Sequence, residues 1–236
     1  MKLVLFDCDG TIVDSAAVIH GCMERTFEDF GLPRPDMAHT KSVIGLTLDI
    51  AIARVLGRPV DAEIAAMTAR YKEHFQLYRS SGGSMEPAYP GMVELILDLA
   101  ARDEVIVGVV TGKSRRGLEV ILAHHGLSGA IFASRTADDC PSKPHPAMVL
   151  ECCAAAGIDP AHTWVVGDAV YDIEMAVNAG ARSIGVSWGY GPVERLEAAG
   201  ATHVVDRADE IGALIFGADA VAAVAGRHRG TDRLHG

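Results

Sequence analysis

The sequence predicts an α/β fold in which a parallel sheet forms the core and a helical cap domain is inserted after the first strand. Two observations lead to this prediction. From Glu104 onward, short runs rich in β-branched apolar residues alternate with helical stretches, which is typical of a parallel sheet covered by helices on both faces. Between Ser15 and Pro87, by contrast, the pattern is helical throughout, and no strand-like run interrupts it.

The core elements follow one another in a regular order. The apolar run Leu3–Phe6 predicts the first strand, and later runs predict strands over 105–110, 131–134, 163–167, 183–188 and 202–205. Helices are expected over 114–125, 145–156 and 170–179, near Val193 and after the last strand. This alternation predicts a Rossmann-like core, on which ligands bind at the carboxyl ends of the strands.

The insertion contains candidate helices near 16–30, 46–56 and 61–79, and the stretch SSGGSMEPAYPG reads as a linker back to the core. We therefore expect an α/β core domain over 1–14 and 87–217 and a helical cap domain over 15–86. Residues 218–236 are alanine-rich and then polar, which predicts a partly disordered C-terminal tail.

Composition narrows the classes of function. The chain of 236 residues has a formal net charge of −10, which argues against nucleic acid as a partner. No apolar run is long enough to span a bilayer, and no signal-peptide pattern precedes the first strand, so no membrane association is expected. The five cysteines form no CxxC pair and give no complete disulfide framework, so we expect a cytoplasmic protein with reduced thiols.

Two pairs of carboxylates follow predicted strands. Asp7 and Asp9 end the first strand in FDCDGT, where residues i and i+2 of an extended chain face the same way and Gly10 permits a sharp turn. Asp168 and Asp172 follow the strand TWVV, and a spacing of four brings helical side chains to one face. A solvated loop and a helix cap are the respective alternatives. Two acidic strand ends at one edge of a sheet would form a hard-oxygen site suited to Mg²⁺.

Two further motifs carry groups suited to phosphate. Thr111 and Gly112 end the run VIVGVV, and a hydroxyl and a backbone N–H at a helix N-terminus can donate to phosphate oxygens, although an ordinary N-cap is the alternative. Lys143 lies on the proline-rich loop SKPHP, where its cation could neutralise a transferring phosphoryl group. A surface lysine is the alternative for that residue.

Together, the four motifs resemble those of the haloacid dehalogenase-like hydrolase superfamily. DCDGT, VVTGK, SKPHP and GDAVYD are similar to its four motifs in order, and the helical insertion is similar to that of its branch with a cap after the first motif. Within this branch the chain is most similar to the phosphoglycolate phosphatases, through DGTIVDS, TGKSRRGLEVILAHHGL, GDAVYDIEMAVNAGA and WGYG. The resemblance implies a Mg²⁺-dependent phosphatase that hydrolyses a small phosphorylated metabolite, with phosphoglycolate as the leading guess, as a monomer or homodimer.

The resemblance also implies roles in a two-step phosphoryl transfer. Asp7 would attack phosphorus as the nucleophile. Asp9 would protonate the leaving alcohol and then take a proton from the hydrolytic water. Thr111, the N–H of Gly112 and Lys143 would hold the phosphoryl oxygens.

For the metal and the cap, the resemblance implies a second set of residues. Mg²⁺ would be bound by Asp7, the Asp9 carbonyl and Asp168, and Asp172 would either bind the metal directly or support its other ligands. The stretch Gly45-Leu46-Thr47 resembles the glycine-containing segment that sets substrate specificity in such caps.

For three other side chains near these motifs, the sequence predicts a role less specifically. Lys41 and Arg54 flank the cap segment and could supply positive charge for a carboxylated substrate, although solvated helix charge is the alternative reading of each. Tyr190, in WGYG, is interpreted as a packing residue.

Two other functions compete with the phosphatase. β-Phosphoglucomutases resemble the chain, but they carry a cap histidine five residues after the last Asp of DGxxxD; Ile19 stands five residues after the equivalent Asp14 here, and His20 comes one position later. One position turns a helical side chain by about 100°, which favours hydrolysis over phosphosugar mutation. A catalytically silent binding or regulatory module is the alternative of another class, and the full set of motif residues argues against it.

Overall fold

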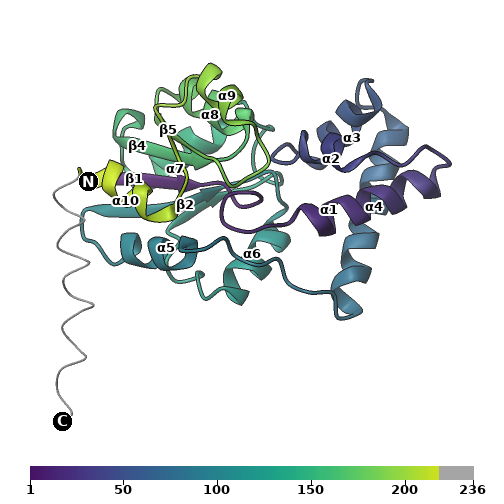
Figure 1. Ribbon diagram of the computed structural model, residues 1–236, viewed down its shortest axis with the longest axis horizontal. Helices are drawn as coiled ribbons and strands as arrows, with labels where there is room; N and C mark the ends of the chain where they lie inside the picture. Colours follow the sequence, from purple (N-terminus) through teal and green to yellow (C-terminus); the bar gives the residue numbers. More distant parts are fainter. Residues whose placement is uncertain (218–236) are drawn as a thin grey trace, which may run out of the picture.

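The computed structural model describes residues 1–217, and in them a six-stranded, fully parallel sheet forms the core (Figure 1). The strands lie in the order β3-β2-β1-β4-β5-β6. Their bounds are β1 Lys2–Phe6, β2 Val105–Val110, β3 Ala133–Arg135, β4 Thr163–Gly167, β5 Arg182–Val186 and β6 His203–Val205. The predicted α/β fold with a Rossmann-like sheet is therefore confirmed. The expected tail over 218–236 lies outside the described residues.

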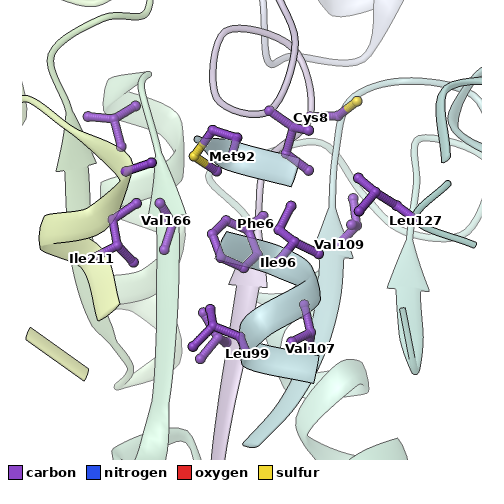
Figure 2. Packing of buried hydrophobic residues seen from close by; sticks show 14 of the residues in the cluster. Phe6, Cys8, Met92, Ile96, Leu99, Val107, Val109, Leu127, Val166 and Ile211 are labelled. Atoms are coloured by element: carbon purple, nitrogen blue, oxygen red, sulfur yellow. The ribbon is translucent and has the colours of Figure 1, made fainter. Parts of the chain in front are cut away.

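Alternate side chains of β1 enter two hydrophobic cores, one on each face of the sheet. Val4 and Phe6 belong to one cluster, whereas Leu3 and Leu5 belong to the other. Figure 2 shows Phe6 beside Met92, Ile96 and Leu99 of α5. Full burial of side chains of this size stabilises the fold by roughly 1.5–3 kcal/mol each. The central strand is thus fixed from both sides, and so is the point at which it ends.

Helices cover both faces of the sheet. The first face carries α5 (Met92–Ala100), α6 (Arg115–His124) and α10 (Ala208–Phe216), and the second carries α7 (Ala147–Ala156) and α8 (Val170–Ala179). The shorter α9 (Val193–Ala198) and the 3₁₀ turn Pro160–His162 lie between later strands. The range of α5 is not among the helices predicted from the sequence, although its buried residues follow the i, i+4, i+7 spacing of a helix face.

Four helices lie between β1 and α5, beside one end of the sheet (Figure 1). They are α1 (Ala16–Asp29), α2 (Met37–Lys41), α3 (Leu48–Leu56) and α4 (Ala62–Ser80). Met23, Ile52 and Met67, from three of these helices, share a hydrophobic cluster separate from those of the sheet. We propose that residues 15–86 form a cap on a core made of 1–14 and 87–217.

The edges of the sheet differ from the sequence-based expectation. The strand expected over 131–134 is β3, which begins two residues later and pairs only with the last three residues of β2. An edge strand has one partner, so it ends where that pairing ends and its apolar pattern locates it poorly. The five-residue helix α2 is not among the predicted helices; the Asp36 side chain caps it by accepting from the His39 N–H.

Within residues 1–217, no helix combines the length and apolar character needed to cross a membrane.

Candidate active site

The candidate site lies at the carboxyl edge of the three central strands. Asp7 follows β1, Thr111 follows β2 and Asp168 follows β4. Because β1 pairs with both β2 and β4, these three strand ends are neighbours. The N–H of Asp7 also donates to the carbonyl of Val166 at 2.8 Å, which continues the pairing with β4 and fixes the Asp7 backbone.

Three of the predicted carboxylates come together. Asp7, Asp168 and Asp172 are buried, and each offers an oxygen within 4.8 Å of the others. The Nζ of Lys143 lies 2.7 Å from Asp7 Oδ1 and 2.6 Å from Asp172 Oδ1. Three carboxylates thus face one ammonium group in a site removed from water. Such a site has an excess of buried negative charge, which a divalent cation would relieve.

The ionisation of these groups reflects that excess. Burial, followed by the nearby charge of Asp172, raises the pKa of Asp168 to about 7. Burial raises the pKa of Asp7 well above its usual range, although Lys143 opposes this effect. Burial disfavours the charged form of Lys143, but the carboxylates of Asp172 and Asp7 outweigh burial and raise the pKa of that amine. The lysine is therefore a permanent cation.

Asp7 has a free coordination position. Its Oδ2 is buried and has no hydrogen-bond partner among the described residues, whereas its Oδ1 accepts from Lys143. A buried, unpaired carboxylate oxygen is costly unless a cation or a proton satisfies it. Mg²⁺ prefers a few carboxylates together with water and phosphate oxygens, so the residues present fit that ion.

The loops around Asp168 hold its side chain on both sides. Thr11 Oγ1 donates to Asp168 Oδ1 at 2.9 Å, and the N–H of Tyr190 donates to Oδ2 at 2.8 Å. A Cβ on Gly10 would lie 2.3 Å from Asp168 Oδ2, and one on Gly189 would lie 2.1 Å from Asp168 Cβ. Gly10 also has φ +90°, so both its conformation and its contact require glycine.

Asp172 is both a cap and a member of the site. Its Oδ2 accepts from the N–H of Ala169 at 3.1 Å at the start of α8, and its Oδ1 accepts from Lys143. The two interpretations left open by the sequence therefore apply together. We propose that Asp172 supports the metal site by positioning Lys143, because one of its oxygens is paired with that cation and the other is held at the start of α8. Asp168, whose two oxygens accept only from uncharged donors, is the metal ligand in this proposal.

Asp9 occupies a different position from the one that strand alternation suggests. The strand β1 ends at Phe6, so the side chain of Asp9 is not part of the three-carboxylate group. Instead it forms an ion pair with Lys113, with 2.8 Å between Nζ and Oδ1. Lys113 is part of VVTGK, but the pattern of that motif predicts no contact between Lys113 and Asp9. Its ammonium group also lies 5.7 Å from the ring of Phe75 in α4, so Lys113 connects Asp9 to the cap.

The structure resolves the alternative reading of Thr111. The N-cap of α6 is Ser114, whose side chain accepts from the Gly117 N–H, and so Thr111 is not that cap. The Thr111 hydroxyl accepts from the N–H of Lys113 at 3.2 Å. Its proton is therefore directed away from that contact and is free to donate to a ligand.

The predicted cap segment lies directly on the core loops. A Cβ on Gly112 would lie 2.5 Å from the Leu46 carbonyl oxygen and 2.6 Å from that of Gly45. The N–H of Thr47 donates to Ser142 Oγ at 3.0 Å, beside Lys143 in the sequence. Gly45, Leu46 and Thr47 thus contact the loops that carry the proposed phosphoryl-holding residues.

A hydrogen-bonded contact and a cavity also lie between the cap segment and the core. Arg54 donates to Tyr171 Oη at 2.7 Å, and that hydroxyl donates to the Ser42 carbonyl at 3.0 Å. A cavity of about 550 Å³ lies between Leu46, Ile50 and Arg54 on the cap side and residues 141–146 on the core side. Its volume is within the range of small-molecule sites, which are about 300–1,000 Å³.

Comparisons with known proteins agree with this arrangement. Residues 4–186 match the family described as haloacid dehalogenase-like hydrolase. The probable phosphatase IndB of Dickeya dadantii is 32% identical over 212 residues, which cover 89% of this chain and 91% of that protein. An N-acetylmuramic acid 6-phosphate phosphatase of Pseudomonas putida is 31% identical, with 89% and 94% covered. A phosphoglycolate phosphatase of Chromobacterium violaceum is 32% identical, with 84% and 90% covered.

Solved structures show the same fold. A hydrolase from Pseudomonas syringae superposes with a TM-score of 0.77 at 22% identity, covering 88% of this chain and 94% of that one. The match of the family to most of the chain, together with relatives above 30% identity over nearly its whole length, leads to one conclusion. The chain belongs to the haloacid dehalogenase-like hydrolase family.

Proposed function

We propose that this protein is a Mg²⁺-dependent phosphatase that hydrolyses a small phosphate monoester through an aspartyl-phosphate on Asp7. The observation that carries the proposal is the environment of Asp7. One of its oxygens is paired with Lys143, and the other is buried with no hydrogen-bond partner among residues 1–217. Asp168 and Asp172 each offer an oxygen within 4.8 Å of one on Asp7. The phosphatases among its relatives support the same reaction class.

In the first step, a carboxylate oxygen of Asp7 forms a bond to phosphorus and the bond from phosphorus to the ester oxygen breaks. Asp9 gives a proton to the departing alkoxide. In the second step, water attacks the phosphorus of the aspartyl-phosphate while Asp9 takes a proton from that water. The bond between phosphorus and Asp7 breaks, so phosphate leaves and Asp7 is restored. One residue thus serves as acid and then as base.

The remaining residues align and neutralise the phosphoryl group. Lys143 supplies a permanent positive charge beside the nucleophile, and Thr111 and the Gly112 N–H supply donors at the end of the neighbouring strand. When bound by Asp7, Asp168 and the Asp9 carbonyl, Mg²⁺ would neutralise further negative charge and fix the phosphate. Phosphoryl transfer depends mainly on such alignment and charge stabilisation.

For the substrate we propose a small, carboxylated phosphate ester such as 2-phosphoglycolate. Relatives are named for glycolate and for N-acetylmuramic acid, and both of these alcohols are also carboxylic acids. The segment Gly45-Leu46-Thr47 is the proposed specificity element, because it contacts the loops of Gly112 and Lys143. The cytoplasm remains the proposed location, since all five cysteines are buried free thiols.

Hydrolysis is favoured over phosphosugar mutation by the position of His20. Its Nδ1 lies 2.9 Å from Thr40 Oγ1, and its Nε2 lies 3.7 Å from Glu24 Oε1. The ring is thus occupied by partners inside the cap and does not control Asp9. We therefore expect water, and not a sugar hydroxyl, to accept the phosphoryl group.

The test is phosphate release from a panel of small esters, including 2-phosphoglycolate, N-acetylmuramic acid 6-phosphate and β-glucose 1-phosphate. We expect Mg²⁺-dependent phosphate release that chelation removes and added Mg²⁺ restores, with Ca²⁺ supporting turnover poorly because its coordination is larger and looser. Full activity in EDTA would contradict the metal site. Conversion of β-glucose 1-phosphate to glucose 6-phosphate with little phosphate released would instead identify a mutase.

A further inference from the structure

The hydroxyl of Tyr190 lies where the chain leaves the core and enters the cap. It accepts from the N–H of Ser15 at 2.8 Å and from the N–H of Ala16 at 3.0 Å, and it donates to Asp14 Oδ1 at 3.0 Å. A phenol oxygen can accept two hydrogen bonds and donate one, so this hydroxyl is fully used. Two of these partners end the segment that connects β1 to α1, and the third, Ala16, is the first residue of that helix.

These bonds complete the start of α1, where the only local side-chain bond that the described residues make to an N–H of Ser15 or Ala16 is from Ala16 to Asp14 Oδ1, at 3.2 Å. Ser15 is the N-cap of α1, but its side chain makes no capping hydrogen bond. The first N–H groups of a helix have no partner within the helix and need one from elsewhere. Tyr190, from a loop 175 positions away in the sequence, supplies that partner for Ser15.

The same residue also holds the proposed metal site. The backbone N–H of Tyr190 donates to Asp168 Oδ2 at 2.8 Å. The glycines on either side allow this close approach, since a Cβ on Gly189 would lie 2.1 Å from Asp168 Cβ and one on Gly191 would lie 2.3 Å from the Asp168 carbonyl oxygen. The position of the Tyr190 ring is therefore set by the loop that contacts Asp168.

The two connections between cap and core lie together at this point. The N–H of Asp14 donates to the carbonyl of Pro87 at 2.9 Å, so the outgoing and returning chains are hydrogen-bonded to each other. From the cap side, Lys41 places its Nζ 5.5 Å from the centre of the Tyr190 ring. Tyr190 thus contacts the outgoing connection at residues 14–16, which we call the hinge, together with Lys41 of the cap and the side chain of Asp168.

We propose that Tyr190 is a positioning residue that ties the cap hinge to Asp168 and so sets how the cap closes over Asp7. The inference rests on the proposed phosphatase function. A packing role would need only the ring, whereas the hydroxyl makes three hydrogen bonds of 2.8–3.0 Å and also lies 3.4 Å from Ser15 Oγ, all of them contacts with residues 14–16. Removing it frees the hinge without changing the backbone contact with Asp168. Closure then becomes less favourable, while the phosphoryl and metal sites stay intact.

The test compares Tyr190→Phe with Tyr78→Phe, a matched control whose hydroxyl donates to the Ser84 carbonyl on the surface of the cap. For Tyr190→Phe we expect KM for the best ester of the panel to rise at least about 5-fold while kcat changes less than about 3-fold. The inhibition constant of orthovanadate and the Mg²⁺ concentration for half-activation should change less than about 2-fold. The control should match the wild type in all four quantities.

Hydrogen exchange of the metal-free proteins gives a readout independent of activity. The amide of Ser15 should exchange at least about 10-fold faster in Tyr190→Phe than in the wild type or in Tyr78→Phe. The amide of Ala16, which also donates to Asp14 Oδ1, should change less. This measurement remains informative if the wild type proves not to be a phosphatase, because it depends only on the hinge. Unchanged exchange would overturn the anchoring role.

A second pair of variants tests the contact from the other side. Asp14→Ala should reproduce the rise in KM, whereas Asp14→Asn, which keeps the carbonyl oxygen that accepts from Tyr190, should not. The double variant of Tyr190→Phe and Asp14→Ala should have about the same KM as each single variant, as expected for two groups that act through one contact. An unchanged KM in Tyr190→Phe, or a fall in kcat together with weaker Mg²⁺ activation, would overturn the proposal.

Discussion

Asp7 lies buried against Lys143, and its negative charge is needed for the proposed reaction but not for the stability of the fold. The Nζ of Lys143 also contacts Asp172, so the lysine keeps a partner if Asp7 loses its charge. Burial makes the ionised form of Asp7 unfavourable, as its raised pKa indicates. A neutral side chain of the same shape should therefore fit this position at little cost in stability.

Asp7→Asn tests the nucleophile on this basis. An amide nitrogen cannot take the place of the attacking carboxylate, so we expect phosphate release to fall below about a hundredth of the wild-type rate. The melting temperature in EDTA should be equal to that of the wild type or higher. Retention of more activity than this would exclude an aspartyl-phosphate on Asp7.

Lys113 is the residue whose removal should be most costly outside the metal site. Its side chain and that of Asp9 are 8% and 9% exposed, so the pair is nearly free of solvent. Lys113→Met would keep the apolar stem but leave Asp9 as an unpaired buried charge. Breaking a buried pair in this way typically costs about 3–5 kcal/mol.

We therefore expect Lys113→Met to lower the midpoint of urea unfolding and to reduce kcat/KM at least about 10-fold, because the acid–base carboxylate loses its orienting partner. Lys72→Met, at an exposed position on α4, is the matched control and should leave both quantities unchanged. Wild-type stability in Lys113→Met would show that the ion pair does not form in solution.

At the scale of elements, the sequence predicted best where neighbours restrict the chain on both sides. The bounds of β2, β4 and α8 agree with the expected ranges, since central strands have continuous apolar runs and α8 packs on one of them. The edge strand β3 has one partner and was displaced in the prediction. The helix α5 was missed because its run of apolar residues, MVELILDLA, follows a stretch interpreted as a linker.

The same distinction applies to the site. Asp7 and Asp168 could be located from the sequence because each follows a central strand. The pairing of Asp9 with Lys113, and the contacts of Tyr190 with Ser15 and Asp168, depend on how loops distant in the sequence pack together. No local pattern encodes such contacts, which explains why Lys113 had no assigned role and Tyr190 was interpreted as a packing residue.

Gly112→Ala tests the contact between the cap segment and the core. The added Cβ would meet the carbonyl oxygens of Leu46 and Gly45, which are backbone atoms and cannot rotate away. The cap segment must therefore shift, and we expect KM to rise at least about 5-fold with a smaller change in kcat.

The matched control for this change is Gly129→Ala, where a Cβ would meet nothing within 4 Å. Gly129→Ala should unfold at the urea midpoint of the wild type. Gly112→Ala should unfold at a lower midpoint, because Gly45 and Leu46 are buried and Leu46 belongs to a hydrophobic cluster with Val43 and Ala51. Equal KM values for the two variants would show that the cap segment does not rest on Gly112 during turnover.

For the whole molecule, the distribution of charge resolves an apparent conflict. The chain has a net charge of −10, and yet the proposed substrate is an anion. Lys143 and Lys113 are both buried next to the acidic residues of the site, where screening by water and salt is weak. Positive charge is thus placed where the phosphate would bind, and the remaining surface does not need to attract it.

The acidic site should also link stability to pH when no metal is bound. The pKa of Asp168 is about 7 in the folded protein, compared with an ordinary value of 3.8. Below about pH 4, Asp168 carries its proton in both the folded and the unfolded chain, so its titration does not change the free energy of unfolding. Between about pH 4 and 7 the unfolded chain releases the proton while the folded chain retains it, so stability falls as pH rises, by an amount on the order of 4 kcal/mol.

We therefore expect urea unfolding in EDTA to show decreasing stability from pH 5 to pH 8, and saturating Mg²⁺ to restore stability at the upper end, because the ion binds only the folded state. General repulsion in an acidic protein would have the same sign, so the comparison with variants decides the cause. Asp168→Asn cannot ionise at this position and should have a shallower slope, whereas Asp103→Asn, at an exposed position, should retain the wild-type slope. A slope that is the same in all three proteins would mean that Asp168 is not the group that binds the proton, and that the three-carboxylate site is less strained than its burial indicates.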